Sequence, residues 1–258
     1  MDFLSSVRTA IHETIGQGSS PIVIFSSTWP FLKEMHRNDV TAVENLLDIL
    51  VEAAGSRSIL MPSFTRGFTE GVCNLDIESS STGVLSECFR KRVGVRRTLS
   101  AFFSFAVMGS VIDEVISLNP KHAWGEGSIY EWMEVRNACF LMFGTNPTHC
   151  SYLHRLEWLA KNVINYRFEK VFSGKLIREG VSVDLEETLF VRKLDPPVVN
   201  DFTVLLPYLE NMGMKLKKPR GVSISSYYAN DLLEHVLPVI RQDPLFTVKN
   251  RKDYEELT

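Results

Sequence analysis

The hydrophobic positions of the chain follow two periods. Apolar residues recur every three or four positions in residues 2–16, 41–54 and 83–92, which predicts amphipathic helices. Short continuous apolar runs at 21–28 and 58–65 lie between these helices and predict buried strands. Because strands and helices alternate along the chain, we predict an α/β fold with a mixed central sheet flanked by helices.

The pattern changes in the C-terminal half of the chain. Apolar runs at 98–108 and 137–144 predict two more buried strands, and Asn146–Pro147 predicts the start of a long helix. Residues 166–194 alternate between apolar and polar positions, which predicts an antiparallel hairpin or meander. The prediction is completed by helices at 201–212 and 230–241, a short strand at 222–226 and a charged, frayed tail at 248–258.

Two helix starts carry the spacing of a capping box. Thr41 with Glu44, and Ser128 with Glu131, place a hydroxyl three residues before a carboxylate at the start of an apolar helical pattern. The Gly125–Gly127 segment precedes the second of these starts. Its backbone N–H groups are expected to be open to a polar ligand at the helix N-terminus.

Composition narrows the classes of function. The 258 residues are 45% hydrophobic and 23% charged with a formal net charge of −3, which is typical of a soluble globular protein. We expect one domain over residues 1–258. Lys and Arg are not in excess, so we expect no nucleic-acid partner. The N-terminus lacks a signal-peptide pattern and no apolar run reaches about 18 residues, so we expect a cytoplasmic protein without a membrane span.

The four cysteines match no zinc-ligand spacing, and we predict no metal site. They are Cys73, Cys88, Cys139 and Cys150. Cys88 and Cys139 lie inside apolar segments, so we expect buried free thiols, which fits a reducing compartment.

Small hydroxyl residues lie at the carboxyl ends of the first two predicted strands. Ligands of α/β sheets bind beyond the carboxyl ends of the strands, where such side chains can hydrogen-bond to them. Serine and threonine at these positions also form turns, and the sequence leaves both interpretations open. The residues concerned are Ser26, Ser27, Thr28, Ser63 and Thr65.

His154 and Glu157 are the predicted catalytic pair. They are three residues apart and share one helix face, and a carboxylate can orient an imidazole so that it acts as a general base. The alternative is a core histidine that is bonded within its own helix. His149, near the predicted start of this helix, either reaches a substrate pocket or is an exposed first-turn residue.

The order of motifs along about residues 20–247 resembles the aminoglycoside 3-N-acetyltransferase family. The central motif is a helix of the type G-x-L-x-E-x-F-R, then Gly-Val, an Arg-rich turn, Ser-Phe and a glycine. The matching residues are Gly83, Leu85, Glu87, Phe89, Arg90, Gly94, Val95, Arg96, Ser104, Phe105 and Gly109. Two further motifs match in His122 to Ser128 and in Leu153, His154 and Glu157.

The resemblance implies transfer of an acetyl group from acetyl-CoA to an amine. It implies that the strand-end hydroxyls and Ser104 contact the thioester or pantetheine of the cofactor, and that Arg96 meets its phosphates unless Arg96 lies in a solvated turn. His122, Glu126 and Ser128, which lie in or beside the Gly125–Gly127 turn, and His149 are the predicted substrate contacts. For His122 the alternative is packing of its turn, and for Glu126 an exposed position.

Histidines of the family are absent at three positions. Ser100 and Phe103 stand where the family has His-Pro-x-His, and Phe25 replaces a histidine after the first strand. In the family the second histidine of His-Pro-x-His is the general base, so His154 with Glu157 is the predicted substitute.

We therefore predict a CoA-dependent N-acyltransferase that acts on the amine of a small molecule. Acidic residues after position 165 are interleaved with Lys and Arg, which favours an amino sugar or a sugar nucleotide over a polycationic drug. The alternative is a catalytically inactive relative that binds a ligand or a partner.

Overall fold

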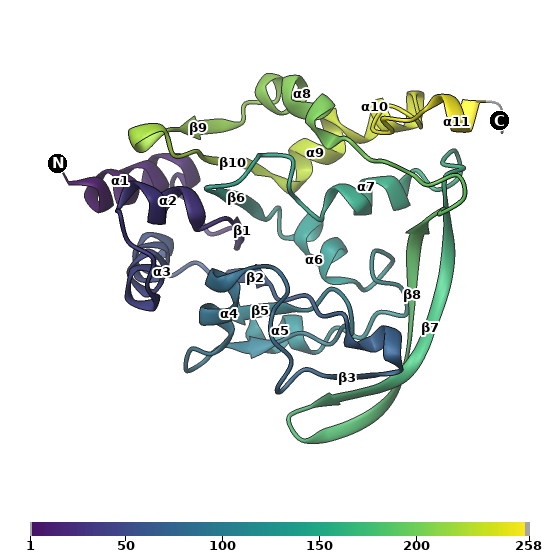
Figure 1. Cartoon of the computed structure of the whole chain (residues 1–258), viewed down its shortest axis with the longest axis horizontal. Coiled ribbons are helices and arrows are strands. Elements are labelled where there is room, and N and C mark those ends of the chain that lie inside the picture. Colours follow the sequence, from purple (N-terminus) through teal and green to yellow (C-terminus); the bar gives the residue numbers. More distant parts are fainter. Residues whose placement is uncertain (1, 256–258) are drawn as a thin grey trace.

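The computed structural model describes residues 2–255, and its centre is a seven-stranded sheet in the order β4-β5-β2-β1-β6-β10-β9 (Figure 1). β1 lies between β2 and β6 and is parallel to both, whereas the other neighbouring strands pair antiparallel. The predicted mixed sheet is thereby confirmed. Its strands are β1 (Ile22–Ser26), β2 (Ile59–Pro62), β4 (Arg96–Arg97), β5 (Phe105–Met108), β6 (Cys139–Phe143), β9 (Lys215–Lys217) and β10 (Ile224–Tyr228).

Each face of this sheet carries its own hydrophobic core, because successive side chains of a strand point to opposite faces. Ile22 and Ile24 of β1 belong to one core, together with α1 (Phe3–Ile15), α2 (Trp29–Glu34), α3 (Val40–Ala54) and α4 (Val84–Arg90). Val23 and Phe25 belong to the other core. That core includes α5 (Ile112–Ile116), α6 (Ile129–Val135), α7 (Leu153–Leu159), α8 (Leu206–Asn211), α9 (Ala229–His235) and α10 (Leu237–Gln242).

A long hairpin forms the second sheet and confirms the predicted antiparallel section. β7 (Arg167–Arg178) pairs with β8 (Val181–Arg192) along their whole length, and β3 (Val72–Asn74) adds a short parallel strand to β7. The two-residue turn uses Glu179 and Gly180, both with positive φ, which suits the right-handed twist of a hairpin. Figure 1 shows the hairpin as a curved arm along one side of the molecule.

The predicted strand at 98–108 is shorter than its apolar run. Residues 98–104 form a loop that is held from the side by Glu187 of β8. The Ser100 hydroxyl donates to one Glu187 oxygen at 2.6 Å, and the Ala101 N–H donates to the other at 2.7 Å. The run is apolar because the loop is buried under the hairpin, and only Phe105–Met108 is extended.

Helix boundaries differ from the prediction where a side chain caps the backbone. Asp39, and not Thr41, caps α3 by accepting the Ala42 N–H at 3.0 Å. The Asn146 side chain accepts the Thr148 N–H at 2.9 Å and forms a turn, so the helix predicted from Asn146 begins only at Leu153.

The capping prediction for Ser128 is confirmed. Its hydroxyl accepts the Glu131 N–H at 3.2 Å, and the Glu131 carboxylate accepts the Gly127 N–H at 2.7 Å. The Gly125 N–H donates to the His122 carbonyl at 3.1 Å. The N–H groups of both glycines are therefore used within the turn, and the prediction that they are open to a ligand is wrong.

Up to residue 255, the C-terminal segment packs against the rest of the protein, and the frayed tail predicted for this segment is wrong there. The helix predicted at 230–241 is divided into α9 and α10, with Pro238 in the first turn of α10. A last turn, α11 (Lys252–Glu255), buries Tyr254 completely, and residues 256–258 of the predicted frayed tail lie outside the described residues. Short 3-10 turns lie at η1 (Gly67–Glu70), η2 (Phe202–Leu205) and η3 (Pro219–Gly221).

The four cysteines are free thiols; Cys88 is half-buried and the others are buried. Within residues 2–255, no helix is both long and apolar enough to cross a membrane.

Candidate active site

His154 and Glu157 meet on α7 as the sequence predicts. His154 Nδ1 lies 2.6 Å from Glu157 Oε2, and the carboxylate is fully buried. Three residues from other elements also bind Glu157: Arg167 at 2.9 Å, the Tyr166 hydroxyl at 2.9 Å and the Asn200 amide at 3.2 Å. The histidine is therefore oriented by a carboxylate that is itself held from three sides.

The charge of this group follows from its partners. Burial by itself raises the pKa of Glu157, but Arg167 and His154 outweigh it and hold the pKa below its usual value. An ionised carboxylate only accepts hydrogen bonds, so the proton between the two side chains belongs to His154 Nδ1. The other ring nitrogen, Nε2, makes no hydrogen bond to the described residues, and the imidazole is 31% exposed. In this tautomer the lone pair of Nε2 is free.

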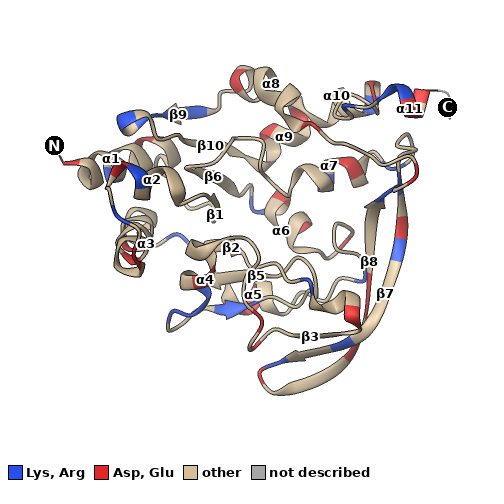
Figure 2. Cartoon of the chain, in the orientation of Figure 1, with Lys and Arg blue, Asp and Glu red and all other residues tan. Residues whose placement is uncertain are grey.

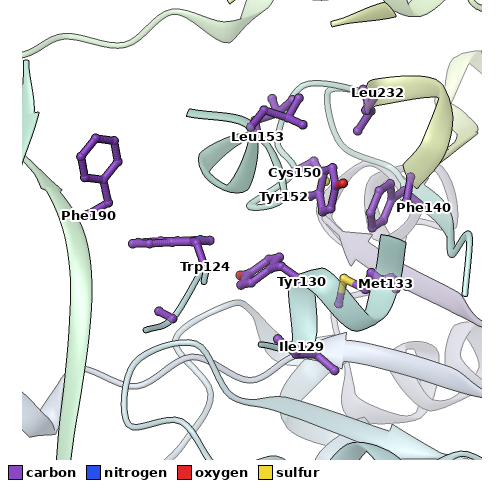
Figure 3. Packing of buried hydrophobic residues seen from close by; sticks show 14 of the residues in the cluster. Trp124, Ile129, Tyr130, Met133, Phe140, Cys150, Tyr152, Leu153, Phe190 and Leu232 are labelled. Carbon is purple, nitrogen blue, oxygen red and sulfur yellow. The ribbon is translucent and has the colours of Figure 1, made fainter. Parts of the chain in front are cut away.

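His154 lines a cavity of about 570 Å³, which we call the acceptor cavity. Its lining residues are Phe103, Trp124, His154, Arg167, Leu189, Phe190, Val191, Arg192, Val199, Asn200 and Phe202. The Trp124 ring contacts both His154 and Phe103, with centroid distances of 5.9 and 4.7 Å. His154 therefore faces the same cavity as Phe103, the residue at the position of the family's histidine. Figure 3 shows Trp124 between Phe190 of the hairpin and Tyr130 of α6.

A second cavity, of about 240 Å³, lies at the carboxyl ends of β1 and β2, and we call it the tip cavity. Its lining residues are Phe25, Ser26, Pro62, Phe64, Thr82, Thr145, His149 and Ser151. His149 is exposed, and its Nδ1 lies 3.1 Å from the Thr145 hydroxyl. The structure thus brings Ser26 and His149 together, at the edge of the sheet where a ligand of an α/β fold is expected.

Thr145 also lines a third, open cavity of about 580 Å³ with a basic rim. Lys33, Lys218 and Arg220 line it; Glu34 is the one carboxylate among its described lining residues and lies 3.5 Å from Arg220. Figure 2 shows the cluster of positive residues along β9 and the turn that follows it. The tip cavity therefore adjoins, at Thr145, a surface that Lys33, Lys218 and Arg220 line.

An aromatic pair separates the tip cavity from the acceptor cavity. Phe64 lines the first and Phe103 the second, and their rings meet edge to face with centroids 5.0 Å apart. The two cavities lie back to back at this pair.

The predicted strand-end hydroxyls fall into two groups. Ser26, Ser27 and Thr28 are half-buried, and their hydroxyls make no hydrogen bond to the described residues. Ser104 is fully buried and donates to the Ser63 carbonyl at 2.7 Å, and Thr65 is buried and bonded to the Ala101 carbonyl. Ser63 is fully buried as well. The second group supports the loop 98–104 and does not line the tip cavity.

The predicted substrate residues of the turn before α6 lie outside both cavities. His122 accepts the Trp124 N–H through Nδ1 at 3.1 Å and packs on Trp158; burial lowers its pKa to about 4, so it is neutral at physiological pH. Glu126 is exposed, and Ser128 is buried as the cap of α6. In this conformation the turn is a structural support of Trp124.

Arg96 is also separated from the tip cavity. It pairs with Glu179 at 2.6 Å and lies 3.7 Å from Asp113, in a cavity of about 190 Å³ beneath the hairpin. Arg96 pairs with Val107 of β5, which is opposite Leu60 in the middle of β2, so Arg96 is not at the carboxyl ends of β1 and β2.

Several residues of the site carry no local signal in the sequence. Arg167 and Asn200 reach Glu157 from positions 10 and 43 residues further along the chain, so only the fold brings them together. Glu187, whose pKa is raised by burial, is another such residue because its partners lie in the loop 98–104. The one signal for Glu187 in the sequence is the alternation of apolar and polar residues along β8, which places Glu187 on the same face as Leu185 and Leu189.

A comparison with known proteins shows the family to which the chain belongs. The family model for aminoglycoside 3-N-acetyltransferase matches residues 31–235, and the chain belongs to this family. A search of curated proteins finds no match.

Solved structures share the fold at low sequence identity. The apoenzyme of aminoglycoside acetyltransferase AAC(3)-IVa is 16% identical, with a TM-score of 0.70 over 98% of this chain and 96% of that chain. AAC-VIa bound to sisomicin is 17% identical, with a TM-score of 0.75 over 93% and 97%. AAC-IIIb with CoASH is 14% identical, with a TM-score of 0.75 over 93% and 96%.

Proposed function

We propose that this protein transfers the acetyl group of acetyl-CoA to the amine of a small molecule, with His154 as the general base. The observation that carries the proposal is the His154–Glu157 pair in the acceptor cavity, directly behind the tip cavity. The pair supplies a basic nitrogen on the same cavity as Phe103, where the family's histidine is missing.

Acetyl-CoA as donor agrees with the family and with the CoASH bound to AAC-IIIb. The residues present fit such a molecule. The free hydroxyls of Ser26, Ser27 and Thr28 are suited to the amides of pantetheine, and the tip cavity to its thioester end. Lys33, Lys218 and Arg220 on the adjoining rim are suited to the phosphates.

The reaction forms one C–N bond and breaks one C–S bond. The neutral amine attacks the thioester carbonyl carbon from the acceptor cavity, and His154 Nε2 takes the proton that the nitrogen loses. The C–S bond breaks, and the thiolate leaves and takes up a proton to give CoASH. Attack needs the reacting atoms about 3–3.5 Å apart, so the Phe64 and Phe103 rings have to turn aside when both substrates are bound.

The acceptor proposed is an amino sugar or a sugar nucleotide, and the proposed location is the cytoplasm. A polycationic drug favours a pocket with several carboxylates. Among the described residues that line the acceptor cavity there is no Asp or Glu.

The second candidate function is binding without catalysis. It is favoured by Phe25, Phe64 and Phe103, which make the meeting point of the two cavities aromatic. A Phe103→His variant separates the candidates. With His154 as base, its turnover stays within about threefold of the wild type or falls; a gain of tenfold or more would mean that the wild type lacks a working base.

The direct experiment is incubation of the protein with acetyl-CoA and a panel of amines, followed by mass spectrometry. Acetylated amine and stoichiometric CoASH are expected with the wild type. Binding of acetyl-CoA without turnover of any amine would favour the second candidate.

A further inference from the structure

The acceptor cavity has a composition that defines a ligand class. We propose that the acceptor carries, besides its amine, an aromatic ring system and an anionic group, and that Arg192 holds the anion. This inference rests on the proposed function only in that it calls the ligand an acceptor, because the binding itself does not need turnover.

The charges around the cavity favour an anion. Its described lining residues include Arg167 and Arg192 but no carboxylate. Glu157, which lies beneath His154, is already paired with Arg167 at 2.9 Å. Asp201 neighbours the lining residues Asn200 and Phe202, but its carboxylate accepts the Thr203 N–H at 3.0 Å as a cap. A ligand with several ammonium groups finds no partner here.

Arg192 is the cation that is free to bind. It lies exposed at the end of β8, and the one hydrogen bond that its side chain makes within residues 2–255 goes to the Val198 carbonyl at 3.3 Å. It forms no ion pair with a described residue. A guanidinium in this position can offer two parallel N–H groups to a carboxylate or a phosphate.

The walls of the cavity are aromatic and apolar. Trp124 and Phe190 are buried, Phe202 is half-buried, and Leu189 and Val191 complete the surface contributed by β8. A flat ring can stack on such a wall. A ring with an anion and an amine, as in a sugar nucleotide or an aromatic amino acid, fits both the charges and the walls of the cavity.

Calorimetric binding without acetyl-CoA tests the inference. The probes are UDP-glucosamine, which carries a diphosphate, para-aminobenzoate, which carries a carboxylate, and sisomicin, which is a polycation. We expect at least one anionic probe to bind more tightly than sisomicin. Arg192→Ala should weaken that binding about tenfold or more, as expected for loss of a charge-assisted hydrogen bond. Arg66→Ala, an exposed arginine outside the described cavities, is the matched control and should change nothing.

Each outcome decides the matter. Preference for UDP-glucosamine assigns a phosphate to Arg192, and preference for para-aminobenzoate assigns a carboxylate. Tighter binding of sisomicin, no anion binding up to about 10 mM, or an unchanged affinity in Arg192→Ala would overturn the inference. Anion binding that depends on Arg192 without any acetyl transfer would uphold it and refute the proposed function instead.

Discussion

His154 Nδ1 lies 2.6 Å from the buried carboxylate of Glu157, and Arg167 lies 2.9 Å from the same carboxylate oxygen. Glu157 therefore binds the Arg167 guanidinium and the His154 imidazole at once. Arg167 keeps it ionised, and the ionised form fixes the histidine tautomer that leaves Nε2 free. We propose that this pair, from another element of the fold, compensates for the family's missing histidine.

Replacement of His154 by alanine should lower kcat about 10²–10⁴-fold, because a positioned base contributes about that factor. The KM for acetyl-CoA should stay within about twofold, since His154 lines the acceptor cavity and not the tip cavity. Steady-state kinetics with a responsive amine measures both. His235→Ala, an exposed histidine on α9, is the control. An unchanged kcat in His154→Ala would exclude it as the base.

Glu157→Gln should destabilise the fold by about 3–5 kcal/mol, because it leaves Arg167 as a buried charge without its carboxylate. The pKa of Glu157 is lower in the folded than in the unfolded protein, where it is about 4.3. Its contribution is therefore present above about pH 4.3 and disappears as pH falls through the folded pKa. Urea unfolding at several pH values should show the difference from wild type shrinking in acid. A constant difference would show that Glu157 is not ionised in the native state.

Glu187 should have the opposite pH dependence. Burial raises its pKa, and the hydrogen bonds from Ser100 and Ala101 offset this only in part. Its native state prefers the protonated form, so its contribution to stability is greatest below about pH 4.3 and declines as pH rises toward the folded pKa. Relative to Glu187→Gln, wild type should lose unfolding free energy between pH 4 and neutral pH. A gain over this range would contradict the assignment.

The basic rim should govern the affinity for CoA. Lys218→Ala combined with Arg220→Ala should raise the KM for acetyl-CoA about tenfold and weaken its dependence on salt, because two phosphate contacts are lost. Arg96→Ala tests the sequence-based alternative in the same assay. A larger effect of Arg96→Ala than of the double variant would place the phosphates beneath the hairpin.

The sequence predicted elements well where one period dominates, as in α1, α3 and the β7–β8 hairpin. The prediction failed at 98–104, where the apolar run forms a buried loop and not a strand. The side chain that holds this loop is Glu187, which is 87 residues away from Ser100 in the sequence. The prediction also failed at Asn146, whose side chain closes a turn instead of capping a helix.

The candidate site could likewise be predicted from the sequence only in part. Spacing alone found His154 and Glu157, since residues three apart on a helix share a face. Spacing could not separate Ser26 at the tip cavity from Ser104 and Thr65, whose hydroxyls are bonded inside the fold. Arg192, at the far end of β8, resembles any charged strand end until its lack of an ionic partner is seen.

Calorimetric titration of acetyl-CoA into the wild type and a Ser26→Phe variant tests the central claim most directly. The account predicts one-site binding by the wild type and its loss in the variant, because a phenyl ring at position 26 fills the tip cavity. Absence of binding to the wild type at millimolar acetyl-CoA, or equal binding to both proteins, would contradict the claim that the carboxyl ends of β1 and β2 hold the thioester.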